Sequence, residues 1–218
     1  MVDRFVSLPE DFCGNIVGDI AGRFATFQTL LSKMPKGPVI SVGDLVDRGP
    51  RSKEVVEWFM MRPDNIALFG NHEDLCVRYL LSQDLLDWKL WENNGGAATL
   101  ASFYDAKEDC PVVSEEIVEW LSALPHHASN RKLIITHAPL FKGCPFPNLG
   151  DKDYFIWNRA HPNRRQEYQV YGHNGVASIQ RDKYGPYAYC IDDSANRKMI
   201  GMHWPSRKLY TVNAEPGE

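Results

Sequence analysis

No run of apolar residues in this sequence approaches the roughly 20 positions that a helix needs to cross a bilayer. The first five residues, Met-Val-Asp-Arg-Phe, include no apolar segment of the kind that a secretory signal requires. The formal net charge is only -4, so no general attraction to nucleic acid or to an anionic membrane is expected. We therefore predict a cytoplasmic protein without nucleic-acid or membrane partners, and the sequence leaves the oligomeric state open.

Paired cysteines are also lacking. The five cysteines lie far apart and form no Cys-x-x-Cys pair: Cys13, Cys76, Cys110, Cys144 and Cys190. This spacing indicates neither a zinc ribbon nor a disulfide framework, so we expect buried, reduced thiols. Two adjacent histidines, His126 and His127, follow Pro125 without a third ligand nearby, and we expect them to lie in a solvated loop.

The composition is that of an ordinary globular protein, with 44% apolar and 24% charged residues in 218 positions. A chain of this length can form one well-buried domain, and no linker or repeat divides it. We therefore predict a single domain over residues 1–218.

Short apolar runs alternate with helical patterns in the first half of the chain. The pattern predicts strands over 15–17, 38–42 and 66–69, and helices over 24–34, 55–60 and 75–80. Residues 82–128 differ and read as a helical insertion, with Ser114 as an N-cap. Further strands are expected over 133–135, 168–170, 187–191, 199–203 and 209–212, with a surface loop over 141–153. This order predicts an α/β fold with a largely parallel sheet.

Polar side chains directly follow several of these strands. The five positions that stand out are Asp19, Asp44, Asn71, His137 and His173. Because successive strands of an α/β sheet direct their carboxyl ends to one crevice, we expect these side chains to meet there. Singly, each is better explained as a turn former or a structural histidine. Together, carboxylates, an amide and imidazoles indicate a two-metal hydrolytic site.

Three multi-residue blocks carry a family resemblance. They are Gly-Asp-Ile-x-Gly from Gly18, Gly-Asp-Leu-Val-Asp-Arg-Gly from Gly43 and Gly-Asn-His-Glu from Gly70. With the two later histidines, they resemble the phosphoprotein phosphatase family of metallophosphoesterases, in its bacterial and phage branch of the lambda-phage phosphatase type. The resemblance implies a calcineurin-like metallophosphoesterase fold, with two central β-sheets sandwiched between helices.

The resemblance also implies a role for each matching residue. Asp44 would bridge two divalent metals, Asn71, His137 and His173 would complete one site, and Asp19 would serve the other. His72 would be the general acid, oriented by Asp47. Arg48 and Arg159 would bind the substrate phosphate, with Asn71 beside it. A metal-bound hydroxide would attack the phosphate monoester. Manganese is the expected metal, and iron or zinc would also suit these ligands.

Ala21 stands where the family has a histidine that binds the same metal as Asp19. In an extended backbone, residues 19 and 21 would point to one side, so the first site would lack a ligand. The chain is then an engineered, impaired variant, a natural member with a weakened site, or a relative that only binds. The intact general acid, His72, favours the first explanation.

The substrate can be read in three ways. Hydrolysis of phosphoserine and phosphothreonine in proteins, with phosphotyrosine as a further possibility, fits the second block best because that block includes Asp47. Symmetrical hydrolysis of dinucleoside tetraphosphates is an alternative, since those enzymes share the same blocks. A non-catalytic phosphate-binding relative is the third. A further departure, Asp192-Asp193-Ser194-Ala195 after the last core strand, is expected to alter the rim of the crevice.

Overall fold

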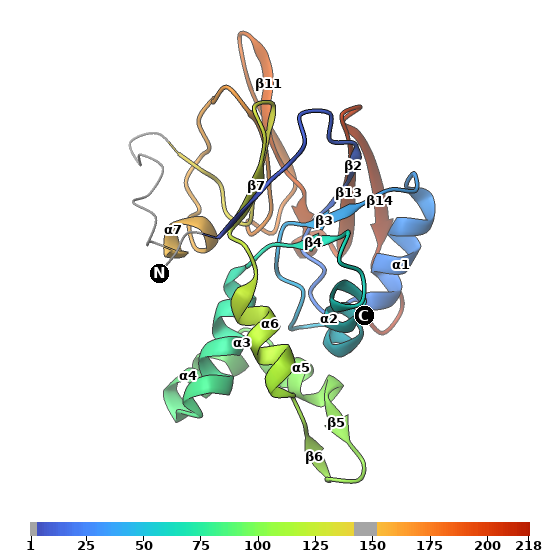
Figure 1. Ribbon diagram of the computed structural model, residues 1–218, viewed down its shortest axis with the longest axis vertical. Coiled ribbons are helices and arrows are strands. Elements are labelled where there is room, and N and C mark those ends of the chain that lie inside the picture. The colour runs from blue at the N-terminus through green and yellow to red at the C-terminus, as the bar shows by residue number, and fades with distance from the viewer. Residues whose placement is uncertain (1–3, 142–151) are drawn as a thin grey trace.

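A computed structural model describes residues 4–141 and 152–218, and in it two β-sheets form the centre of the fold (Figure 1). The first sheet has the strand order β1 (Phe5–Ser7), β7 (His127–Ser129), β8 (Leu133–Thr136), β9 (Tyr168–Tyr171), β11 (Gly185–Cys190) and β10 (Ser178–Asp182). The second has the order β12 (Asp192–Asp193), β13 (Lys198–Trp204), β2 (Gly14–Val17), β3 (Val39–Ser41) and β4 (Ile66–Ala67), with β14 (Lys208–Asn213) also paired to β13.

Both sheets are mixed. The pairs β2–β3 and β3–β4 are parallel, as are β8–β9 and β9–β11. The strands β10, β13 and β14 are antiparallel to their neighbours. At the margin of the first sheet β1–β7 is also parallel, whereas β7–β8 and β2–β13 inside the sheets are antiparallel. The expected parallel arrangement is therefore confirmed for β2–β3–β4 and for β8–β9–β11. The parallel strands all present their carboxyl ends at one edge, and the predicted polar segments follow there.

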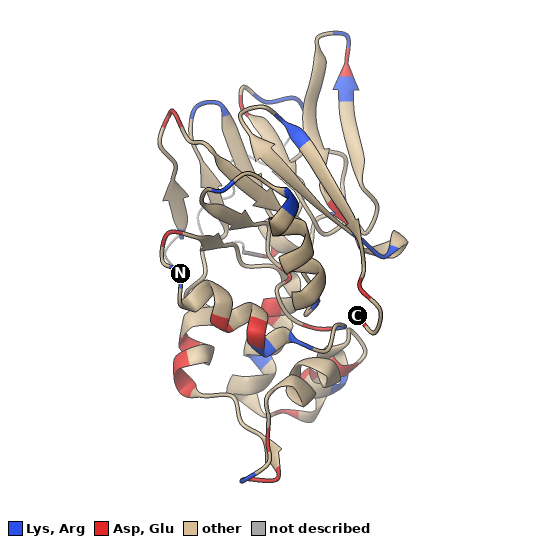
Figure 2. Ribbon diagram, turned by 90° about the vertical axis from the view of Figure 1, so that its right-hand side faces the viewer, with Lys and Arg blue, Asp and Glu red and all other residues tan. Residues whose placement is uncertain are grey.

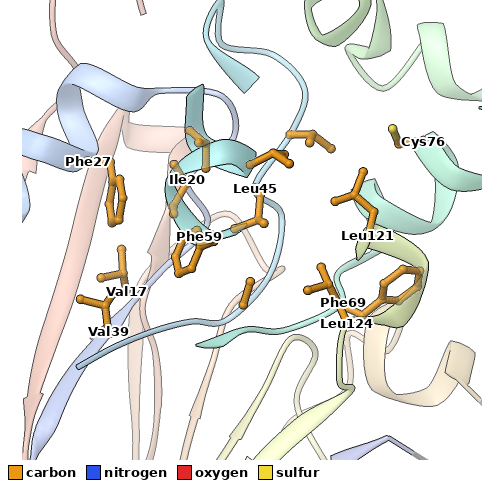
Figure 3. Packing of buried hydrophobic residues seen from close by; sticks show 14 of the residues in the cluster. Val17, Ile20, Phe27, Val39, Leu45, Phe59, Phe69, Cys76, Leu121 and Leu124 are labelled. Atoms are coloured by element: carbon orange, nitrogen blue, oxygen red, sulfur yellow. The ribbon is translucent and has the colours of Figure 1, made fainter. Parts of the chain in front are cut away.

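Apolar side chains hold the two sheets face to face and fix the helices outside them. One cluster joins the sheets through residues such as Ile16, Ile40, Ile135 and Val170. A second cluster packs α1 (Phe24–Lys33) and α2 (Ser52–Met60) against β2 and β3. Figure 3 shows Phe27 and Phe59 of these helices close to Val17 and Val39. The resulting layers are those of the calcineurin-like metallophosphoesterase fold predicted above.

Most of the segment 82–128 lies beside α3 (Asn71–Ser82), below the sheets in Figure 1. Its predicted end is two residues too late, because His127 and Ala128 belong to β7 of the first sheet. The segment holds α4 (Leu85–Glu92), α5 (Gly96–Ser102) and α6 (Glu115–Ala123), and Ser114 accepts a hydrogen bond from Ile117 as the N-cap of α6. It also holds a small hairpin of β5 (Tyr104–Asp105) and β6 (Cys110–Pro111), which the sequence did not predict. No helix in the described ranges is long and apolar enough to span a membrane.

Three local expectations need correction. His127 is not a solvated loop residue, because it lies in β7, is 5% exposed and stacks on Phe5. Cys13 and Cys110 are exposed thiols, whereas Cys76 and Cys190 are buried as expected and Cys144 lies outside the described residues. The predicted loop over 141–153 lies mostly outside the described residues, and its last two positions belong to α7 (Lys152–Ile156).

Charge is unevenly distributed over the fold. Figure 2 shows Lys and Arg in loops at the upper end of the sheets and Asp and Glu mainly on the helices below. At the amino ends of β8 and β9, a cavity of about 530 Å³ combines five cations with three aromatic rings: Arg131, Lys132, Arg164, Arg165 and Arg207, with Tyr168, Tyr187 and Trp204. This cluster could not be predicted from the sequence, because its members come from separate segments.

Candidate metal centre

Two loops that follow neighbouring strands are held together by backbone hydrogen bonds. Asp19 comes after β2, and Asp44 comes after β3. The backbone N–H groups of Ile20 and Ala21 both donate to the carbonyl of Asp44, at 3.0 and 2.7 Å. Gly43 has a φ of 107°, and a Cβ there would lie 2.9 Å from the nitrogen of Gly70. Only glycine therefore lets this loop approach the next one so closely.

Unusual backbone geometry is concentrated here. Of the nine non-glycine residues with positive φ in the described chain, five belong to the predicted site: Ala21, Asp44, Asp47, Arg48 and His173. Such conformations cost free energy and persist where the surrounding structure requires a particular side-chain direction. The clustering marks these loops as functional.

The five predicted metal ligands are brought together. Donor atoms of Asp19, Asp44 and His137 all lie within 4.8 Å of one another. The amide oxygen of Asn71 lies 2.9 Å from Nε2 of His137 and 2.8 Å from Nδ1 of His173. The donor atoms therefore converge from the ends of β2, β3, β8 and β9 and from the first residue of α3.

The chemistry of these contacts fits a cation. Burial lowers the pKa of His137 and so favours the neutral ring, whose Nδ1 donates to the carbonyl of Val42 at 3.1 Å. The other ring nitrogen, Nε2, then carries a lone pair. That lone pair faces two acceptor oxygens, from Asn71 at 2.9 Å and from Asp44 at 3.3 Å. A divalent cation between these atoms would turn mutual repulsion into coordination.

The carboxylates have contrasting pKa shifts. Burial alone would raise the pKa of Asp44, but His137 and His72 outweigh it and lower the pKa to about 2. Burial, Asp192 and Asp44 raise the pKa of Asp19 well above its usual value. Burial, together with His137, lowers the pKa of His173 to about 3, which keeps this imidazole neutral. The protein therefore stabilises the negative charge of Asp19 less well than that of Asp44, and a cation beside Asp19 would compensate for this difference.

His72 and Asp47 form a buried pair beside the ligands. Nδ1 of His72 donates to Oδ2 of Asp47 at 2.6 Å, and both side chains are almost fully buried. Trp91 and Thr99, which belong to the segment 82–128, donate to the same carboxylate and so fix its position. Burial opposes the protonation of His72, yet Asp44 and Asp47 raise its pKa. The pair has the arrangement of a general acid and its orienting carboxylate.

Glu73 binds the backbone of the loop that contains Asp44. From the sequence alone, this residue was not identified as part of the site. Its carboxylate accepts hydrogen bonds from the backbone N–H groups of Asp44, Leu45 and Gly70 at 2.7 to 2.9 Å, and it is fully buried. Burial and the charge of Asp44 raise the pKa of Glu73 to about 7. The sequence feature that could have identified Glu73 is its position as the last residue of the Gly-Asn-His-Glu block.

Replacing Glu73 with Gln is expected to destabilise the metal-free protein by about 3 kcal/mol, because an amide nitrogen would face buried backbone donors. Thermal unfolding should show a decrease in Tm of roughly 6–12 °C for a chain of this size. Glu54→Gln is the matched control, since Glu54 is half-exposed and contacts only Arg51 among the ion pairs of the described residues. An equal Tm for both variants would contradict this role of Glu73.

A cavity of about 290 Å³ opens above the ligands. Arg48 and Arg159, the predicted phosphate-binding residues, both line it. Arg48 donates to Nε2 of His72 at 2.9 Å, and Arg159 donates to the carbonyl of His173 at 3.1 Å. Arg48 therefore covers the ring nitrogen that would serve as the acid, and a substrate phosphate would compete for this guanidinium.

The expected geometry at residue 21 was wrong. Ala21 has a φ of 50° and is not extended, so the argument from an extended backbone does not apply to the direction of its side chain. Its side chain is buried and is not part of the described cavity wall. Position 21 still lacks an atom that could bind a metal. The positive φ turns the backbone at Ala21, which lets this residue contact the loop of Asp44.

The cavity wall also includes residues that the sequence did not assign. They are Arg23, Asn94, Trp157, Gly175, Asp192, Ser194 and Ala195. Three of these belong to the Asp192–Ala195 segment, which the sequence indicated as a changed rim. Arg23 follows the first block directly, and its Nε is buried without a hydrogen-bond partner among the described residues. Its position next to the block was the signal that could have identified it.

Known proteins share this architecture. Residues 15–191 match the family model of calcineurin-like phosphoesterases. A symmetrical bis(5'-nucleosyl)-tetraphosphatase of Pseudomonas fluorescens is 32% identical over 129 residues, which cover 56% of this chain and 40% of that protein. Serine/threonine-protein phosphatase 2 of Escherichia coli is 29% identical over 131 residues, or 56% of each chain. A crystal structure assigned provisionally as a diadenosine tetraphosphatase has a TM-score of 0.71 at 20% identity and covers 99% of this chain and all of its own.

Proposed function

This chain belongs to the calcineurin-like phosphoesterase family, and we propose that it hydrolyses phosphate monoesters with two divalent cations. The observation that carries the proposal is Nε2 of His137, which faces an oxygen of Asn71 at 2.9 Å and an oxygen of Asp44 at 3.3 Å. Asp19 and His173 would complete the ligand set. When bound, the cations would polarise the phosphoryl group and make hydroxide available near neutral pH. Manganese is the proposed metal, with iron or zinc as substitutes.

The side chains around the ligands would perform the remaining steps. Arg48 and Arg159 would bind the phosphate oxygens from two sides of the cavity. When phosphate draws Arg48 away from His72, Nε2 of this ring becomes free to hold a proton. His72 would then donate that proton to the leaving oxygen, while Asp47 holds the ring in place.

Phosphorylated serine or threonine in a protein is the proposed substrate. The similarity to the E. coli serine/threonine phosphatase and the buried His72–Asp47 pair support this choice. A leaving alkoxide of serine needs protonation, which this pair would supply.

A dinucleoside tetraphosphate is the second candidate. The relative from P. fluorescens and the full-length similarity in fold support it. So does Arg23, a third arginine in a cavity where Arg48 and Arg159 would suffice for one phosphate. Its unpartnered Nε offers a donor to a further phosphate group of a polyphosphate chain.

Ala21→His is expected to raise kcat/KM for an unactivated phosphomonoester by about 10–100-fold in the presence of manganese, since a ligand is added to the first site. Activity would be measured with a phosphoserine peptide, diadenosine tetraphosphate and an aryl phosphate, for both forms of the protein. The preferred substrate decides between the two candidates. Ala101→His, at an exposed position of α5, is the control. A histidine at position 21 that brings no gain with manganese would count against an impaired hydrolase and favour a chain that only binds phosphate.

A further inference from the structure

Two aspartates from distant parts of the sequence lie side by side at the half of the site that Ala21 leaves incomplete. Gly18 precedes Asp19, and Ile191 precedes Asp192. A Cβ on Gly18 would lie 2.3 Å from the carbonyl oxygen of Ile191, so the two backbones cross in direct contact and only glycine allows it. Asp19 and Asp192 both line the cavity.

One short loop fixes both carboxylates. The backbone N–H of His173 donates to Asp19, while the backbone N–H of Gly175 donates to Oδ2 of Asp192. Oδ1 of Asp192 accepts from the backbone N–H of Ser194 at 2.9 Å. Each carboxylate oxygen can accept two hydrogen bonds, so Asp192 keeps acceptor sites for a further ligand.

Asp192 forms no close ion pair within the described chain, although it attracts the positive charge of Arg23 at longer range. Asp192 is 2% exposed, and Asp19 and Asp44 are 7% and 3% exposed. Arg23 shares the cavity with them but forms no ion pair with Asp192, and its Nε is unpartnered. Buried carboxylates without a counter-charge are costly, and a bound cation removes that cost.

We propose that Asp192 completes the first cation site of this chain in place of the histidine that Ala21 lacks. The inference rests on the proposed function and adds a ligand-supporting residue to it. Asp192 is outside the trio of Asp19, Asp44 and His137, whose donor atoms lie within 4.8 Å. It would therefore act from outside this trio, as a carboxylate that supports the cation and its bound water. The chain is then a natural relative with a differently built first site, which is the second of the explanations for Ala21.

Calorimetric titration with Mn²⁺ tests this inference without any assay of turnover. The unmodified chain should bind two cations, and Asp192→Asn should weaken the weaker of the two sites by about 10–100-fold. Asp193→Asn is the matched control. Asp193 is the next residue and is also buried, but it accepts from Asn196 and Ala177 and does not line the described cavity. This control should bind both cations with unchanged affinity.

A double variant separates a role at the metal from a purely structural role. Adding Ala21→His to Asp192→Asn should restore the affinity of the weaker site, because the new imidazole compensates for the lost carboxylate. A double variant that keeps the weakened site would overturn the inference, since Asp192 would then only hold its loop. Equal affinities in the unmodified chain and Asp192→Asn, or a single cation in the unmodified chain, would overturn it too. A chain that binds no manganese at all would contradict the proposed function itself.

Discussion

Asp44→Asn is expected to reduce kcat/KM for an aryl phosphate by on the order of 10³-fold or more. Loss of a residue that only supports a ligand typically costs about 10–100-fold, and Asp44 is placed to serve both cations. Asp44 lies within reach of Asp19 and His137, and its pKa of about 2 keeps it ionised throughout the working range. Asparagine keeps one oxygen but removes the charge, so bridging two cations becomes unfavourable.

The backbone should tolerate this replacement. Asp44 has a φ of 52°, a conformation that asparagine adopts readily. Asp109→Asn is the matched control, because Asp109 also has a φ of 52° but is exposed in the segment between β5 and β6. Activity and the number of bound Mn²⁺ ions would be measured for both variants. If Asp44→Asn retains both full activity and two cations, Asp44 is not a bridging ligand.

The part of the site that follows strands could be predicted from sequence. Asp19, Asp44, His137 and His173 each come within three residues of a strand end, and parallel strands direct those ends to one edge. Local order along the chain was therefore enough to bring these groups together. Asn71 could be placed in the same way, because it is the first residue of α3 and the loop before it follows β4.

The contacts that hold the site residues in place could not be predicted from the sequence. They join segments that lie far apart in the chain, and no sequence pattern indicates which segments will meet. Trp91 and Thr99 reach Asp47 from the insertion, 44 and 52 positions away. The contact between Gly18 and Ile191 depends on how the two sheets face each other. At the margin of the first sheet, β10 was missed because its sequence is Ser-Ile-Gln-Arg-Asp, and partly exposed polar residues do not give the signal of a core strand.

Backbone conformation was the remaining source of error. The extended conformation assumed at Ala21 failed because the loops after β2 and β3 bind each other through the carbonyl of Asp44. That pairing turns the chain at Ala21 to a positive φ. Tertiary hydrogen bonds thus overrode the local preference of alanine, which ordinarily avoids this region.

Asp47→Asn is expected to move the alkaline limb of the pH–activity profile to lower pH. The pKa of His72 is raised by the charges of Asp44 and Asp47, although burial acts in the opposite direction. The protonated ring is the acid, so activity is present below this pKa and falls as the pH rises through it. Asparagine removes one of the two negative charges, and the pKa of His72 must then fall. Activity would consequently be lost at a lower pH than in the unmodified protein.

The shift expected for Asp47→Asn can be measured as the pH dependence of kcat/KM for an alkyl phosphate, whose leaving group needs a proton. His72→Asn should lower kcat/KM by about 10²–10⁴-fold and abolish the limb, since the acid itself is gone. An activated aryl phosphate is the internal control, because its leaving group departs without protonation and should be much less affected by either variant. The 2.6 Å contact between Nδ1 and Oδ2 is the physical basis of the shift. Superimposable profiles for Asp47→Asn and the unmodified protein would show that this contact orients the ring without setting its pKa.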